Sequence, residues 1–74
     1  MSQELRRQVR AAVAELPPEQ RAVVVMHHIE GLPVAQIAQV VGASPGTVMS
    51  RLARAREILR RKLAAHVEPE PVQR

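Results

Sequence analysis

Cations gather in one short stretch of the chain, between residues 51 and 62. This stretch has five Arg, one Lys and one Glu, a net charge of +5, whereas residues 1–50 have four Arg and four Glu and are neutral overall. A guanidinium group stays charged at physiological pH and donates paired hydrogen bonds to phosphate or to the edge of guanine. The stretch is therefore suited to binding a polyanion, which favours nucleic acid.

The same stretch predicts a helix with two different faces. At about 100° per residue, apolar side chains at Val48, Leu52, Ala55, Leu59 and Leu63 form one stripe. The opposite face begins with small residues and continues with cations, a pattern that can enter the major groove and neutralise phosphates. A solvated basic face on an ordinary bundle helix also fits this pattern. The outward positions are Gly46, Ser50, Ala53, Arg54, Glu57, Arg60 and Arg61, with Met49 on their edge and Arg51 and Arg56 flanking the stripe.

A shorter helix and a tight turn precede the basic helix and would position it. Residues 34–41 have apolar side chains at i, i+3, i+4 and i+7, which indicates one helix face. Gly42 follows, where a helix usually ends in a left-handed residue, and Ser44 can cap the next helix by accepting a backbone N–H. Pro45 suits the first position of that helix, where no N–H is needed. The spacing predicts a helix-turn-helix over residues 33–56.

Two further helices complete an all-α fold. Ser2 can cap a first helix, which Leu16-Pro17-Pro18 ends, and the second proline can begin a helix over residues 18–29 that ends at Gly31. The run Val23–Met26 is rich in β-branched residues, but a lone strand could not satisfy its backbone. We predict a four-helix domain of residues 1–66 with a C-terminal helix-turn-helix, and a flexible polar tail of residues 67–74. The apolar stripe of the first helix is Leu5, Val9, Ala12, Val13 and Leu16.

The composition excludes several classes of function. The 74 residues contain no Cys, so neither a disulfide nor a zinc–thiolate site can supplement the core. They contain no Phe, Tyr or Trp, which argues against single-strand platforms that stack bases on aromatic rings. No apolar run reaches the length of a membrane span, and no signal peptide is visible. We therefore expect a cytoplasmic protein with no membrane partner.

No combination of side chains indicates an enzyme. His27, His28 and Glu30 are of metal-ligating types, but consecutive helical residues point about 100° apart, so the two imidazoles should not converge. The seven acidic residues are all Glu and occupy mostly helix starts or solvated faces. Ser44 and Ser50 have no nearby base, and capping and DNA contact explain them better than nucleophilic catalysis. We expect no catalytic site, no metal and no cofactor.

Six short motifs spread over about residues 15–63 carry a family resemblance. They are Leu16-Pro17-Pro18, Glu30-Gly31-Leu32, Ile37-Ala38, Gly46-Thr47-Val48, Ser50-Arg51-Leu52 and Arg54-Ala55-Arg56. Together they resemble region 4 of a bacterial sigma factor of the extracytoplasmic-function group. The resemblance implies a domain that reads the −35 promoter element as duplex DNA in the major groove. It also implies docking on the β flap of the RNA polymerase core and an anti-sigma factor as a further partner.

The resemblance assigns roles to residues of the basic helix. Base-facing positions are Ser50, Ala53 and Arg54, with Met49 beside them, and positions that approach phosphates or brace the helix are Thr47, Arg51 and Arg56. The predicted DNA-binding residues are thus Ser44, Thr47, Met49, Ser50, Arg51, Ala53, Arg54 and Arg56.

Two of these positions depart from the pattern of the family. Met49 stands where a cation is common, and Ala53 stands where a larger residue is common. Direct readout should therefore lean on Arg54, on Met49 against thymine methyl groups, and on DNA shape.

Two other functions fit a fold of this kind. One is a protein-interaction module bound mainly by an anti-sigma factor or polymerase. The small number of base-reading residues favours this function, whereas the +5 charge of the helix argues against it. The other is the DNA-binding domain of a two-component or quorum-type regulator, which has a similar helix layout. The run from Ser50 to Arg56 resembles the sigma family more closely.

Overall fold

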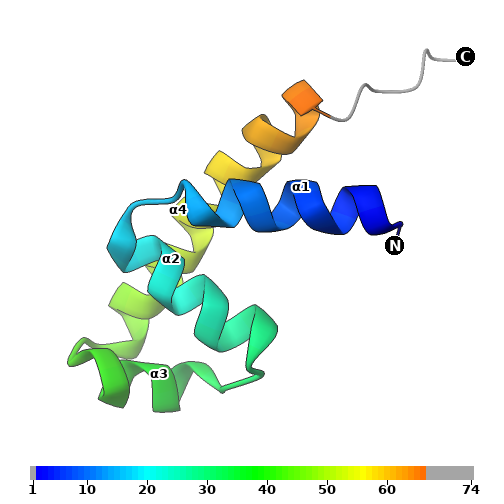
Figure 1. Cartoon of the computed structure of the whole chain (residues 1–74). Coiled ribbons are helices and arrows are strands. Elements are labelled where there is room, and N and C mark those ends of the chain that lie inside the picture. The colour runs from blue at the N-terminus through cyan, green and yellow to red at the C-terminus, as the bar shows by residue number, and fades with distance from the viewer. Residues whose placement is uncertain (1, 67–74) are drawn as a thin grey trace, which may run out of the picture.

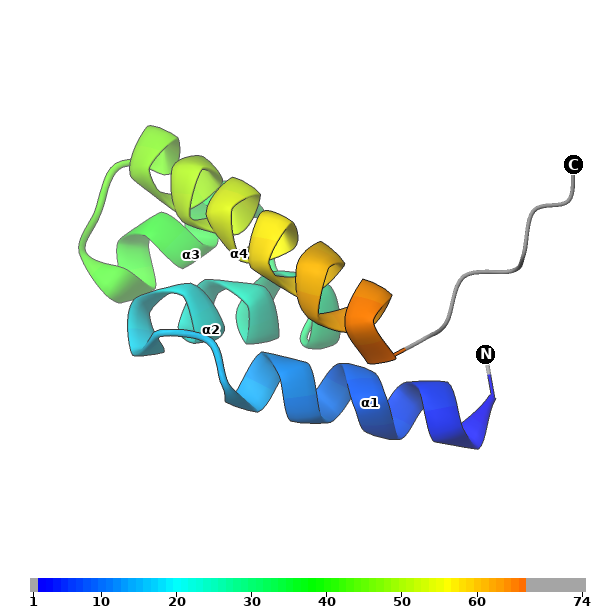
Figure 2. The ribbon, with the colours of Figure 1, turned by 90° about the horizontal axis from the view of Figure 1, so that it is seen from above.

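Helix α4 (Pro45–His66) is the element against which the other helices pack (Figure 1). The computed structural model describes residues 2–66, and the predicted tail of residues 67–74 lies outside them. Figure 2 shows α4 along one side of the domain, with α1 (Gln3–Ala14) and α2 (Pro18–Val24) facing it. The remaining elements are η1 (Val25–Ile29), a π-helical turn, and α3 (Val34–Val41). The described residues contain no strand, which confirms the predicted all-α fold.

Capping and proline residues fix the two ends of α1. The Ser2 hydroxyl accepts a hydrogen bond from the Leu5 backbone N–H at 3.0 Å, as predicted. The helix ends before Pro17 and Pro18, and Arg21 of α2 donates to the exposed Ala14 carbonyl at 3.1 Å. A last-turn carbonyl of α1, which has no partner within its own helix, is thereby satisfied by the next one.

The predicted helix of residues 18–29 forms, but its last turn is wider than expected. α2 passes without a break into η1, where the Glu30 N–H donates to the Val25 carbonyl at 2.9 Å. Gly31 then adopts a left-handed φ of 77° and ends the element. The strand alternative for Val23–Met26 is wrong, because Val23 and Val24 are buried on a helix that packs against α4.

The helix-turn-helix has the predicted geometry. Gly42 closes α3 with φ 71°, and the N–H groups of Gly42 and Ala43 both donate to the Ala38 carbonyl at 2.9 and 3.0 Å. This is how a glycine ends a helix whose last carbonyls lack partners. The Ser44 hydroxyl then accepts from the Thr47 N–H at 3.1 Å and begins α4.

The core is made of short aliphatic side chains from all four helices. Its most deeply buried large members are Val23 of α2, Ile37 of α3 and Val48 of α4, each with 0% of its surface exposed. The three meet where the helix-turn-helix joins the rest of the domain. The core therefore fixes the angle at which α4 is presented. Its buried members are Ala12, Val13, Leu16, Val23, Val24, Ile37, Ala38, Val48, Leu52 and Ala55.

Candidate nucleic-acid interface

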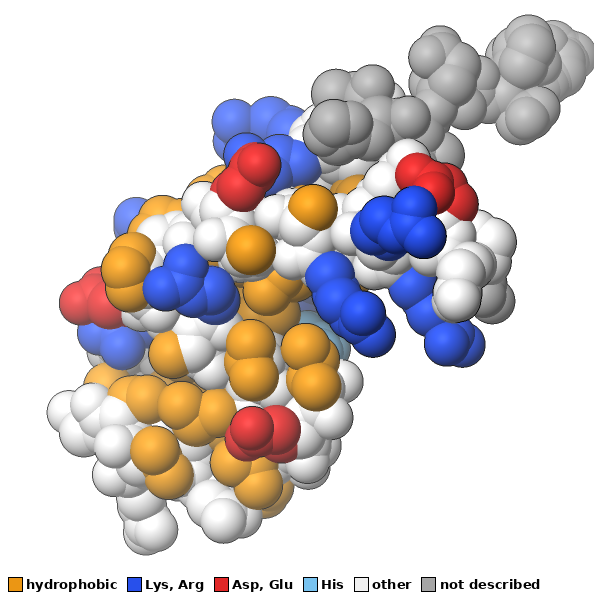
Figure 3. Space-filling model, in the orientation of Figure 1, with side chains coloured by type: hydrophobic (Ala, Val, Ile, Leu, Met, Phe, Trp, Pro, Cys, Tyr) orange, Lys and Arg blue, Asp and Glu red, His pale blue; other side chains and the backbone are white. Residues whose placement is uncertain are grey.

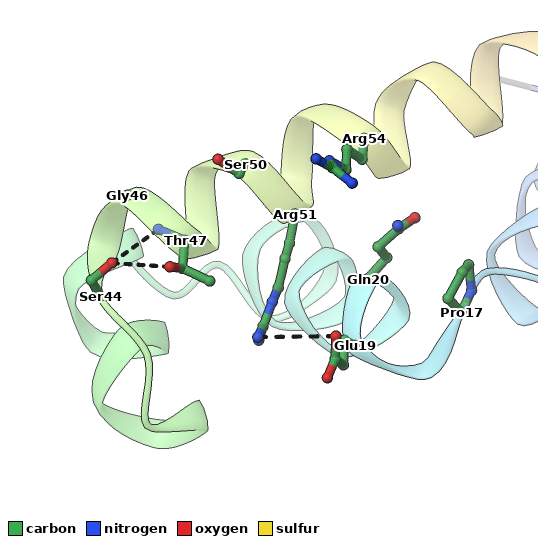
Figure 4. A pocket seen from close by; sticks show the side chains of 9 residues that line it. All are labelled: Pro17, Glu19, Gln20, Ser44, Gly46, Thr47, Ser50, Arg51 and Arg54. Carbon is green, nitrogen blue, oxygen red and sulfur yellow. Dashed lines mark hydrogen bonds and ion pairs between the residues drawn. The ribbon is translucent and has the colours of Figure 1, made fainter.

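A groove lies between the start of α2 and the first turns of α4 (Figure 4). Its volume is about 620 Å³. It brings together five of the eight predicted DNA-binding residues and leaves Met49, Ala53 and Arg56 outside. The lining residues are Pro17, Glu19, Gln20, Ser44, Gly46, Thr47, Ser50, Arg51 and Arg54.

The first turn of α4 is held by two hydroxyl groups. Ser44 Oγ accepts from the Thr47 N–H and donates to Thr47 Oγ1, both at 3.1 Å. The Thr47 hydroxyl keeps its own hydrogen as a donor, and both side chains are exposed. Gly46 between them presents no side chain, so this end of α4 offers a low, polar surface to the groove.

Arg51 reaches across the groove to α2. One of its terminal nitrogens lies 4.0 Å from the Glu19 carboxylate, and its side chain is only 27% exposed (Figure 4). The sequence left two roles for Arg51, approaching phosphate or bracing the helix, and the observed contact is a brace between α2 and α4. An ion pair at this exposure contributes little, about 0–1 kcal/mol.

The charges of α4 divide into paired and unpaired groups. Besides Arg51, Arg60 and Arg61 share Glu57 at 2.8 and 3.8 Å, and Lys62 Nζ lies 2.8 Å from Glu15 of α1. Within residues 2–66, the two cations of this stretch without an ion pair are Arg54 and Arg56, and both are exposed. These two arginines need break no internal contact to meet an anion.

The remaining predicted residues lie on the surface of α4 outside the groove. Met49 is 60% exposed and therefore fills no gap in the core. Ala53 is also exposed, one residue before Arg54. Met49 is thus available for contact with a partner.

Four residues of the groove are outside the predicted DNA-binding set: Pro17, Gly46, Glu19 and Gln20. Glu19 and Gln20 belong to α2, far in sequence from α4, and only the packing of the two helices brings them beside Arg51 and Arg54. Glu19 is also the acidic residue in the first turn of α2, where a carboxylate favours the helix dipole. No local pattern marks Gln20, because its role depends on which helix packs above it.

An apolar groove of about 590 Å³ opens on another side of α2. Figure 3 shows hydrophobic side chains gathering over α2 and α3 on this face. The exposed Val40 (62%) lines it, and the exposed Ile29 (65%) lies on the adjoining π-helical turn. Uncovered aliphatic groups at a rim of charged residues are typical of a protein-binding surface. The lining residues are Pro18, Arg21, Ala22, Val25, Met26, Glu30, Leu32 and Val40.

The two adjacent histidines lie closer together than expected. Their rings meet edge to face with centroids 4.8 Å apart, so the expectation that they do not converge is wrong. The wider π-helical turn reduces the angle between successive side chains. His27 Nδ1 is hydrogen-bonded to the Leu32 carbonyl at 3.0 Å, which ties η1 to the segment before α3. Across residues 2–66, no three His, Cys, Asp or Glu side chains are grouped so as to hold a metal ion.

The described chain contains no helix with the length and apolar character needed to cross a membrane.

Comparison with known proteins supplies the family context of this interface. The family described as Sigma-70, region 4 matches residues 6–59. The extracytoplasmic-function (ECF) RNA polymerase sigma factor SigE of Mycolicibacterium smegmatis is 48% identical over 58 residues, which are 78% of this chain and 23% of that protein. SigM of Mycobacterium tuberculosis is 47% identical over 74% of this chain and 28% of its own length. SigW of Bacillus subtilis is 33% identical over 85% of this chain and 34% of its own length. The chain thus spans about a quarter to a third of these relatives.

Proposed function

Because the chain belongs to the region 4 family of sigma-70 factors, in its extracytoplasmic-function branch, we propose that it binds duplex promoter DNA in transcription initiation and reads the −35 element through α4. The family is a DNA-binding one rather than an enzyme class, and its match argues against the two-component or quorum-type regulator. The observation that carries the proposal is the groove beside α4. It gathers Ser44, Thr47, Ser50, Arg51 and Arg54.

The residues on the exposed face of α4 are suited to different contacts with DNA. Arg54 is unpaired and lines the groove, so we assign it to a base edge, where a guanidinium can donate two hydrogen bonds to guanine. Ser50 and Ala53 are small and exposed, which lets the helix lie close to the bases. Met49 presents a thioether suited to a thymine methyl group. Arg56 is assigned to phosphate.

Selection of preferred duplexes from a random pool, using the full chain, tests this function. Enrichment of a bipartite, −35-like sequence supports specific readout. A pool that shows no enrichment contradicts it and favours the protein-interaction module bound mainly by an anti-sigma factor or polymerase.

Replacing Arg54 with Ala is expected to remove sequence preference rather than overall affinity. The ratio of affinities for the selected duplex and a scrambled one should fall by about 1–3 kcal/mol, because a bidentate contact to one base is lost. Competitive binding measured at constant salt gives this ratio. Arg56→Ala is the matched control and should weaken both duplexes to the same extent. If Arg54→Ala also weakens both equally, Arg54 is a phosphate contact and the base-reading assignment fails.

We further propose that the apolar groove docks on the RNA polymerase core, through its β flap. The apolar groove is lined mainly by α2 and η1, and Val40 is its one residue from α3. On α2 it uses Arg21 and Ala22, whereas the groove beside α4 uses Glu19 and Gln20. The two surfaces therefore take separate parts of α2, so one partner need not displace the other. Val40 and Ile29 supply the exposed aliphatic area that such docking would cover.

The variant Val40→Glu tests the docking surface. Placing a carboxylate in the apolar groove should weaken binding to the polymerase flap about tenfold or more, because the charge must lose its hydration on docking. DNA affinity should match that of Gln39→Glu, which adds the same charge at the exposed neighbouring position of α3. Equal flap binding by the two variants would mean that this groove is not the docking surface.

A further inference from the structure

Gln20 lines the groove beside α4 and carries a buried hydrogen-bond acceptor that has no partner among the described residues. The residue lies in the first turn of α2, and its side chain rises from that helix toward Arg54 of α4 (Figure 4). Its Oε1 atom is buried and has no hydrogen-bond partner among residues 2–66. Because buried polar atoms are nearly always paired in folded proteins, an unpaired acceptor beside a binding groove calls for a donor.

Two arginines line the groove with Gln20, and one of them forms no ion pair within the described residues. Arg51 is held by the Glu19 carboxylate at 4.0 Å. Arg54 forms no ion pair within the described residues and lies across the groove from Gln20. A guanidinium has five N–H donors, of which a two-pronged contact to a base uses two. Arg54 therefore keeps donors that can serve a second acceptor at the same time.

We infer that Gln20 is a positioning residue for Arg54: when α4 lies on DNA, Gln20 Oε1 accepts an N–H of Arg54 and fixes the plane of the guanidinium against the base edge. The inference rests on the proposed function, because it requires Arg54 to contact DNA. It adds a residue outside the helix-turn-helix to the reading of sequence. It also gives α2 two related tasks, since Glu19 holds Arg51 and Gln20 orients Arg54.

Gln20→Met tests the inference, because it keeps the length of the side chain and removes the acceptor. We expect the preference of the full chain for the selected duplex over a scrambled duplex to fall about tenfold, the effect of losing one hydrogen bond to a charged group. Affinity for the scrambled duplex and its salt dependence should stay unchanged, because no charge is removed. Gln20→Glu keeps an acceptor and should retain the preference while binding all duplexes more weakly.

Gln8→Met is the matched control. Gln8 of α1 also has a buried Oε1 without a partner, but it lies outside the groove. Both substitutions remove the same kind of acceptor, and Gln8→Met also removes an exposed hydrogen bond from Gln8 Nε2 to Glu4 Oε2 at 3.2 Å, so thermal unfolding of both variants shows any general effect on stability. If Gln8→Met lowers the sequence preference as much as Gln20→Met does, the effect is not local and the inference is overturned.

The double variant Gln20→Met/Arg54→Ala separates positioning from direct contact. If Gln20 acts through Arg54, Gln20→Met has no further effect on preference once Arg54 is absent. An undiminished effect in the double variant would show that Gln20 acts on DNA itself, and the inference would fall. If Arg54→Ala alone leaves the preference intact, the proposed reading by Arg54 fails together with the inference. If Arg54→Ala abolishes preference and Gln20→Met does not change it, only the inference fails.

Discussion

Raising the salt concentration is expected to weaken DNA binding by the isolated domain steeply. If three to five cations of α4 reach phosphates, log K falls with log salt at a slope of about −2.7 to −4.5, because each contact releases a condensed counterion. Between 50 and 200 mM salt the affinity then drops roughly 40- to 500-fold. Fluorescence anisotropy of a labelled duplex, titrated at several salt concentrations, gives the slope.

The ion pairs of α4 set the expected range of three to five phosphate contacts. Arg54 and Arg56 are unpaired, and Arg51 can exchange its 4.0 Å contact with Glu19 for a phosphate, which gives the lower bound of three. Arg60 and Arg61 share the single carboxylate of Glu57, which cannot neutralise both of them. Both can therefore contact phosphates as well, which gives the upper bound of five phosphate contacts. Lys62 lies 2.8 Å from Glu15 at the α1 side of the helix and is not counted.

A pair of charge-matched variants controls for net charge. Arg56→Gln should make the slope shallower by about 0.9, one phosphate contact. Arg10→Gln removes the same charge from α1, away from the interface, and should leave the slope as it was. A flat salt response of the unmodified domain would rule out phosphate contact by α4. Equal changes in the two variants would mean that net charge, rather than the position of Arg56, governs binding.

Local chemistry was sufficient to predict where the helices begin and end. Ser2 and Ser44 cap, Gly31 and Gly42 adopt left-handed conformations, and each feature depends on residues within four positions in the chain. The apolar stripes were equally predictable, because a period of 3.6 residues determines which side chains share a face. The widened turn of η1 was not, since the sequence reads there as an ordinary helix.

The candidate site was predictable only on one of its two walls. Spacing along α4 identified Arg51 and Arg54 as candidate DNA-binding residues, and their contacts with DNA stay predictions. The opposite wall comes from α2, about thirty residues earlier, and is set by helix packing rather than by any local pattern. Glu19 and Gln20 were therefore missed as groove residues, although Glu19 forms the ion pair with Arg51 that leaves Arg54 as the unpaired arginine of the groove.

Replacing Ile37 with Ala is expected to cost the domain about 2–5 kcal/mol of unfolding free energy, the range for deleting a fully buried aliphatic side chain. Ile37 is 0% exposed and packs in the cluster with Val23 and Val48, so the loss leaves a cavity between α3 and the helices it joins. At roughly 0.05–0.15 kcal/mol per residue, a domain of this size has little stability to spare. Urea unfolding followed by circular dichroism measures the change, and at the low end of this stability range a large unfolded fraction should be visible without denaturant.

The matched control is Val40→Ala on the same helix, where the side chain is 62% exposed and the loss should stay within about 0.5 kcal/mol. DNA binding distinguishes the two ways in which Ile37→Ala can act. If the substitution only shifts the folding equilibrium, a saturating duplex binds the folded form and restores the helical signal, because a ligand of the folded state stabilises it by mass action. If helix content returns but sequence preference does not, Ile37 also sets the angle at which α4 enters the major groove of the DNA. Equal losses of stability in the two variants would contradict the central place of Ile37 in the core.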